Sequence, residues 1–184
     1  ISVTPSLTTL EKTCVGPVLN FTITINPTST ILDPTDQFIC NGSPTNSINF
    51  SGSGTSYTWV NNNTTTGLQS SGTGNITSFN AVNLGLDPIV SIVTVTSQFT
   101  GGGVTCLGNN TSFDITVIPT PTVIIPDEQT ICNGDISSLV NLTGNATNFS
   151  WTNSLPSIGL ANSGTGNIPV FTATNNTSNP VVAT

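Results

Sequence analysis

The sequence predicts an all-β chain made of two tandem copies of one sandwich module. Three observations lead to this prediction. The sequence repeats itself with an offset of 92 residues and no gap, apolar residues alternate with polar ones over short runs, and clusters of Gly, Asn, Ser and Pro separate these runs. No stretch shows the 3.6-residue periodicity of an amphipathic helix.

The repeat extends over the whole chain. At the offset of 92, 36 of the 92 aligned positions carry identical residues. Ungapped identity at this level does not arise by chance, so the two halves are copies of one module. The longest matches are Ile-Cys-Asn-Gly at 39–42 and 131–134, Ser-Gly-Thr-Gly-Asn-Ile at 71–76 and 163–168, and the pair Trp59 and Trp151.

Proline-rich stretches predict where the modules begin and end, because linkers and strand starts favour proline. They lie at residues 26–28 and 118–122. One complete module is therefore expected over residues 27–118. Residues 119–184 are expected to form a module that lacks its last strands, and residues 1–26 are expected to be the last strands of a neighbouring module. The chain ends are thus expected to be out of phase with the fold.

The expected strands are short and regularly spaced. Residues 21–25, 89–96 and 113–117 alternate apolar and polar side chains. About seven such strands in roughly 90 residues are typical of an immunoglobulin-like β-sandwich. Trp59 and Trp151 fall in the middle of a strand at one repeated position, so a role in the core is favoured over a role as ligand-stacking platforms.

The composition excludes several classes of function. Lys12 is the only basic residue, there is no His, and eight acidic residues give a net charge of −7. Without a basic patch, binding to nucleic acid or to an anionic membrane is disfavoured, and no apolar run is long enough to span a bilayer. Without His, the usual general base and metal ligand are missing. We therefore expect no enzyme, no catalytic residue, no metal centre and no cofactor.

Each repeat carries two cysteines. In the complete module, a Cys40–Cys106 disulfide would cross-link distant strands around the core, and two free thiols are the alternative. Cys14 and Cys132 lack such a partner in their own part of the chain. We therefore expect Cys132 of one unit to pair with Cys14 of the next unit, across the unit boundary. A bond between them within one chain would require a closed ring.

Three weaker signals have structural readings. The acidic pairs near the module starts offer fewer ligands than a calcium site needs, and the Ser-Gly-Thr-Gly-Asn runs precede neither a Lys nor a helix, so they are turns. Asn-x-Ser/Thr sequons would be glycan acceptors only in a eukaryotic or viral secretory setting. The acidic pairs are Asp33/Asp36 and Asp127/Glu128, and the sequons include Asn20, Asn62, Asn75, Asn109 and Asn145.

An ordered set of motifs resembles the PKD-like, immunoglobulin-like repeats of very large cell-surface proteins in Bacteroidota. The set comprises Ile-Cys-Asn-Gly at 39–42, Tyr-Thr-Trp at 57–59, Ser-Gly-Thr-Gly-Asn-Ile at 71–76, a Cys-x-Gly turn at 106–108, Phe-x-Ile-Thr-Val-x-Pro-Thr-Pro-Thr at 113–122 and Ser-Ile-Gly-Leu at 157–160. The first repeat departs from it at residues 64–66. The resemblance implies tandem arrays exported to the cell surface, with roles in adhesion, gliding or filament formation and no catalytic residues.

Three functions remain open at this point, all extracellular. The first is a structural subunit of a bacterial filament or surface fibre whose partners are copies of itself or adjacent repeats, joined head to tail. Either the chain is a window on a longer array, or separate subunits exchange strands and form an open filament. The second is an adhesin that recognises glycans or surfaces through loops such as 61–66 and 99–104. The third is an accessory domain of a secreted hydrolase.

Overall fold

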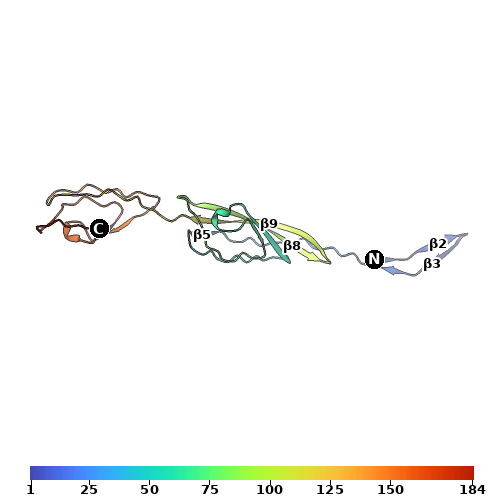
Figure 1. Cartoon of the computed structure of the whole chain (residues 1–184). Helices are drawn as coiled ribbons and strands as arrows, with labels where there is room; N and C mark the ends of the chain where they lie inside the picture. The colour runs from blue at the N-terminus through green and yellow to red at the C-terminus, as the bar shows by residue number, and fades with distance from the viewer. The chain divides into compact units, whose positions relative to one another are not determined.

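The computed structural model describes all residues from 1 to 184 and is almost entirely β, which confirms the all-β part of the predicted fold class (Figure 1). Its two helices are single 3-10 turns, η1 (Thr64–Thr66) and η2 (Pro156–Ile158), and neither is long or apolar enough to cross a bilayer. The chain divides into two compact units. Unit 1 comprises Ile1–Val82 and Val90–Val117, and unit 2 comprises Asn83–Ile89 and Ile118–Thr184. The module boundaries inferred from the prolines stay a prediction.

Unit 1 is built on a five-stranded sheet with the order β5-β9-β8-β6-β7. Strands β8 and β9 form a long hairpin whose turn contains Gly102 and Gly103, both with a positive φ that glycine adopts without strain. Strand β6 is antiparallel to β8, with Trp59 opposite Val95. The bounds are β5 (Gln37–Cys40), β6 (Ser56–Asn61), β7 (Ser71–Thr73), β8 (Ile89–Gly101) and β9 (Val104–Ile118).

The core of unit 1 lies between this sheet and a second group of extended segments. These segments are joined by single antiparallel bridges, among them Ile48 to Ile76. The ring of Phe50 lies 6.4 Å from that of Phe113 on β9, so the two layers are in contact. This arrangement is consistent with a β-sandwich. The buried apolar residues are Ile48, Phe50, Trp59, Leu68, Ile76, Ala81, Val93, Val95, Phe113, Ile115 and Val117.

Residues 1–26 form a separate hairpin, here called the N-terminal hairpin. Its strands β2 (Ser6–Thr9) and β3 (Lys12–Val15) pair around a two-residue turn, and β1 (Ser2–Val3) pairs with β4 (Leu19–Asn20). The hairpin matches β8 and β9 at the repeat offset. Even a side-chain contact is repeated, because the hydroxyls of Thr8 and Thr13 lie 2.8 Å apart and those of Thr100 and Thr105 lie 2.9 Å apart.

Unit 2 reproduces the local structure of unit 1 without the long hairpin. Strand β10 (Ser150–Thr152) pairs with β11 (Ser163–Thr165) as β6 pairs with β7. The bridge between Val140 and Ile168 repeats that between Ile48 and Ile76. The sheet of unit 2 has two strands, and Pro119 is its only buried apolar side chain. A module that lacks its long hairpin therefore keeps its turns and loses its core.

The structure contains no disulfide, so the predicted Cys40–Cys106 bond is not formed. The reason is strand direction. Cys40 ends β5, which lies beside β9, whereas Cys106 lies near the beginning of β9. Residues 26–36 run parallel to β9. Hydrogen bonds join Asn26 to Val104, Ser29 to Asn109, Asp33 to Thr111 and Asp36 to Asp114, so both segments advance in the same direction.

This parallel register brings Cys40 to the end of β9, about 12 residues or 40 Å from Cys106 at a rise of about 3.3 Å per residue. A disulfide needs the two Cα atoms within about 7 Å. The prediction was wrong because the position of a cysteine in the sequence, early or late in the module, does not determine at which end of the sheet that cysteine lies. Cys14, Cys40 and Cys132 are exposed free thiols, and Cys106 is half-buried.

In each repeat, the tryptophan packs against a glycine on the neighbouring strand, and both repeats carry this glycine. A Cβ added to Gly72 would lie 2.2 Å from Cζ2 of Trp59, and one added to Gly164 would lie 2.2 Å from Cζ2 of Trp151. We expect Gly72→Ala to lower the free energy of unfolding of unit 1 by about 1–3 kcal/mol, because the ring must move out of a packed site. Urea unfolding measures this cost. A cost that persists when Trp59 is also changed to Leu would contradict the explanation.

Candidate functional site: an open groove in unit 2

The long hairpin supplies almost half of the core of unit 1. Strands β8 and β9 supply five of its eleven buried apolar side chains, and each of the five is at most 2% exposed. In the sheet, β9 lies between β5 on one side and β8 on the other. The five side chains are Val93, Val95, Phe113, Ile115 and Val117.

Unit 2 has a groove in the place that β9 occupies in unit 1. It has a volume of about 660 Å³ and lies between residues 126–131 and residues 180–184. At the repeat offset these segments correspond to residues 34–39, which lead into β5, and to residues 88–92, where β8 begins. The apolar residues that line the groove include Ile131, Val140, Ile158, Leu160, Ile168, Phe171 and Ala173. The groove is therefore the open half of a core.

The N-terminal hairpin carries the apolar face that would fill such a groove. At the repeat offset, the five core residues of β8 and β9 correspond to residues of the N-terminal hairpin that are all exposed. They are Ile1 (61% exposed), Val3 (48%), Phe21 (49%), Ile23 (66%) and Ile25 (88%). Complete burial of a side chain of this size contributes about 1.5–3 kcal/mol. The chain thus presents an uncovered apolar hairpin and an uncovered apolar groove, and the same two parts are joined in unit 1.

The two tryptophans, predicted to be core residues, have different surroundings. Trp59 is 7% exposed and lies on a strand that β8 flanks, whereas Trp151 is half-buried. In both, the indole Nε1 is shielded from solvent and has no hydrogen-bond partner. Neither ring is displayed as a flat stacking surface, since one face of each lies on the glycine of the adjacent strand.

The acidic residues considered for calcium have other roles in unit 1. The carboxylate of Asp33 accepts a hydrogen bond of 2.6 Å from the hydroxyl of Thr111, and that of Asp36 accepts one of 2.8 Å from the main-chain N–H of Asp114. Both bonds hold the segment before β5 against β9. In unit 2, Asp127 and Glu128 line the groove instead.

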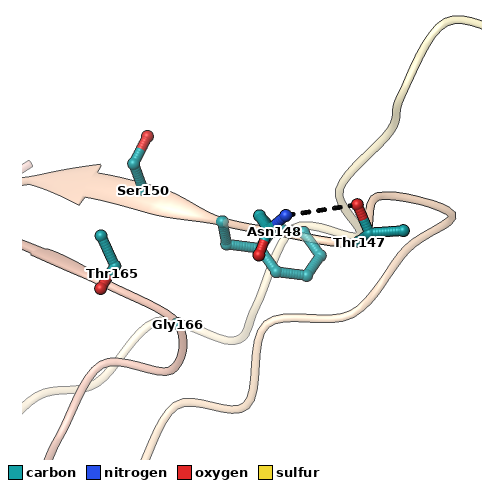
Figure 2. A pocket seen from close by; sticks show the side chains of 6 residues that line it. Thr147, Asn148, Ser150, Thr165 and Gly166 are labelled. Atoms are coloured by element: carbon teal, nitrogen blue, oxygen red, sulfur yellow. Dashed lines mark hydrogen bonds between the residues drawn. The ribbon is translucent and has the colours of Figure 1, made fainter.

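A second hollow in unit 2 contains no reactive group (Figure 2). It has a volume of about 590 Å³ beside the start of β10, and Asn148 Nδ2 donates a 3.4 Å hydrogen bond to Thr147 Oγ1 at its rim. Figure 2 shows Ser150 on β10 and Thr165 on the neighbouring segment. With neutral polar groups and one aromatic ring, this hollow offers no acid, base or nucleophile pair. The lining residues are Thr147, Asn148, Phe149, Ser150, Thr165 and Gly166.

The loops expected to carry an adhesin site have local structural roles. Asn61 Nδ2 donates to the carbonyls of Leu68 and Gln69, and the Asn63 side chain accepts from Thr65 N and caps η1. Residues 99–104 form the closed end of the β8–β9 hairpin. No specific feature of these loops favours ligand recognition.

A comparison of the chain with models of known protein families gives no match, and a search of curated protein sequences gives none either. The resemblance to PKD-like repeats therefore stays a prediction. The chain is characterised by its own internal repeat, of which one copy has a buried core and the other contains an open groove.

Sequence reasoning predicted an incomplete second module but did not identify the residues that line its groove. The signal was nevertheless present. Three residues that line the groove correspond, at the repeat offset, to core residues of unit 1: Val140 to Ile48, Leu160 to Leu68 and Ile168 to Ile76. A comparison of the two repeats at core positions would have located the groove.

Proposed function

We propose that this chain is a structural subunit of an extracellular bacterial filament or surface fibre, built from β-sandwich modules joined head to tail. The proposal assigns no catalytic role and no cofactor to the chain. It places the immunoglobulin-like modules at the cell surface, where a chain with a single basic residue resists trypsin-like proteases.

One observation carries the proposal. In unit 1, the β8–β9 hairpin fills the core. The equivalent hairpin at residues 1–26 has an exposed apolar face, and the equivalent place in unit 2 is an open groove. A hairpin on one side and a groove on the other form a heterologous contact, which propagates without closing. Such a contact joins modules into a linear fibre, whether the next module lies on the same chain or on another.

A disulfide between Cys14 and Cys132 does not form part of the proposal. These cysteines correspond to Cys106 and Cys40, which lie near opposite ends of β9 in unit 1. A hairpin docked in the same manner keeps Cys14 and Cys132 equally far apart. The fibre contact is therefore apolar packing and main-chain hydrogen bonding.

The purified chain is expected to form linear polymers whose length increases with protein concentration. Light scattering and negative-stain electron microscopy measure this. Because the contact is mainly apolar and includes no ion pair, polymer length should not fall between about 0.15 M and 1 M NaCl. A chain that stays monomeric at all concentrations, or polymers that dissolve in salt, would contradict the proposal.

The single basic residue provides a matched control. Lys12 lies directly after the turn of the N-terminal hairpin, so trypsin is expected to cut only between the two arms. Chain cut before assembly should polymerise far less than uncut chain. For native material, a reducing denaturing gel shows either a band near 18.9 kDa, which indicates separate subunits, or a much larger species, which indicates one continuous array.

A further inference from the structure

We infer that the peptide bond between Asp87 and Pro88 is a self-cleavage site, at which the chain breaks itself in mildly acidic solution without an enzyme. The bond lies in an exposed loop directly before β8, where the sequence reads Leu-Asp-Pro-Ile at 86–89. The inference does not depend on the fibre proposal, because it concerns a covalent reaction within one loop.

The carbonyl of Asp87 is bound by a donor whose orientation is fixed. Asn83 Nδ2 donates a 2.9 Å hydrogen bond to the main-chain carbonyl oxygen of Asp87. Oδ1 of the same side chain accepts a 2.9 Å hydrogen bond from Gly85 N, so both ends of the amide are held. Asn83 is 3% exposed, whereas Asp87 and Pro88 are exposed. A buried and oriented donor is therefore aimed at the carbonyl of an exposed residue.

This donor lies where negative charge develops when the Asp87 side chain attacks its own main chain. An oxygen of the Asp87 carboxylate bonds to the main-chain carbonyl carbon of the same residue. The carbonyl oxygen takes the displaced electron pair, and the Asn83 amide stabilises the resulting oxyanion. When the carbonyl re-forms, the bond from its carbon to the Pro88 nitrogen breaks and leaves a cyclic anhydride. The nitrogen takes a proton from the acidic solvent and leaves as a secondary amine.

A water molecule then opens the anhydride, so that Asp87 carries its side-chain carboxyl and a new α-carboxyl. Proline is required as the leaving residue. Its bond to the preceding residue is a tertiary amide, whose nitrogen is protonated more readily than that of an ordinary peptide bond. Only Asp33 and Asp87 are followed by proline in this chain.

The Leu-Asp-Pro sequence at residues 32–34 provides the first internal comparison. The carboxylate of Asp33 accepts a 2.6 Å hydrogen bond from the hydroxyl of Thr111 on β9. This hydrogen bond must break before the carboxylate can attack its own carbonyl carbon. We therefore expect the bond after Asp33 to be cleaved more slowly than the bond after Asp87, although the local sequences are alike.

Unit 2 provides the second comparison, because it has the donor without the carboxylate. At the repeat offset Asn83, Asp87 and Pro88 correspond to Asn175, Asn179 and Pro180. Asn175 Nδ2 donates a 2.9 Å hydrogen bond to the carbonyl of Asn179, as Asn83 does to that of Asp87. The side chain at 179 is a neutral amide, which is a poorer nucleophile than a carboxylate. Cleavage is therefore expected after Asp87 and not after Asn179.

Acid acts on this loop through Asp87 alone. Residues 83–89 contain no other titratable side chain. The side chains that donate to carbonyls of the loop are the neutral amides of Asn83, bound to Asp87, and of Asn145, bound to Leu86 over 3.1 Å.

The two products remain together while unit 1 is folded. The break leaves β5, β6 and β7 on one piece and β8 and β9 on the other. Strands β6 and β8 stay paired along the sheet, and the buried side chains of Val93 and Val95 lie in the shared core. The cleaved chain should therefore elute as one species from a native sizing column and as two pieces under denaturing conditions.

Incubation of the full chain in mildly acidic buffer tests the inference, with circular dichroism to verify that the chain stays folded. Mass spectrometry of the products measures cleavage after Asp87 and after Asp33 in the same molecules. Because one oxyanion donor contributes about 10²–10³-fold to the rate in enzymes, we expect cleavage after Asp87 to be at least about tenfold faster. In concentrated urea at the same pH the two rates should become equal. A preference that persists in urea, equal rates in the folded chain, or no cleavage after Asp87 would overturn the inference.

Two substitutions isolate the role of the donor. Asn83→Asp keeps an oxygen for Gly85 N but removes the amide that donates to Asp87, so cleavage after Asp87 should fall to the rate seen after Asp33. Asn179→Asp supplies the missing carboxylate beside Asn175, so it should create a second fast site before Pro180. A gained site does not arise from misfolding. An unchanged preference in Asn83→Asp, or cleavage in Asn179→Asp that is no faster at the new site than after Asp33, would contradict the inference.

Discussion

The substitution Ile115→Ala is expected to lower the free energy of unfolding of unit 1 by about 2–5 kcal/mol. Ile115 is completely buried on β9, where it belongs to the apolar layer that includes Phe113 and Val117. Removal of three carbon atoms there loses burial energy and leaves a cavity in a small core. Urea unfolding, followed by Trp59 fluorescence in a Trp151→Phe background, measures the change.

The matched control is Ile23→Ala, since Ile23 occupies the same repeat position and is 66% exposed. Below the concentration at which the chain polymerises, Ile23→Ala should change the stability of unit 1 by less than about 0.5 kcal/mol. Equal costs at the two positions would mean that the N-terminal hairpin belongs to the core of unit 1. The same substitution should weaken polymerisation, because burial of Ile23 is gained only on docking.

The substitution Trp59→Ala is expected to cost unit 1 about 3–5 kcal/mol. The indole packs on Gly72, and Val95 on the paired strand β8 lies opposite Trp59. Its loss removes the largest side chain of the core. Hydrogen exchange at the amides of Val95 and Ile115 measures the effect, because these amides should exchange only when unit 1 opens.

Trp151→Ala provides the comparison in unit 2. Trp151 packs on Gly164 in the same way but is only half-buried, and β10 has no second neighbouring strand, so its loss should cost the monomer clearly less than the loss of Trp59. In the polymer the two costs should become similar, because the docked hairpin would place Val3 against Trp151. A cost at Trp151 that does not rise on assembly would contradict docking at this site.

The sequence by itself determined that the chain is all-β and that it contains two copies of one repeat. Alternation of apolar and polar residues predicts strands because side chains alternate between the two faces of a strand. The offset of 92 residues then relates many local features of one repeat to those of the other. The pairing of Trp59 with Gly72 recurs in Trp151 and Gly164, and the turn at residues 71–76 recurs at 163–168.

Only the tertiary structure decided which residues meet across the sheet. The Cys40–Cys106 prediction was wrong because residues 26–40 run parallel to β9, and the direction of a pairing between distant segments is not contained in local patterns. The groove of unit 2 likewise has no local signature. Its lining residues, such as Val140 and Ile168, lie in segments with the same alternation of apolar and polar residues as their buried equivalents in unit 1. The difference is that no strand equivalent to β9 covers them in unit 2.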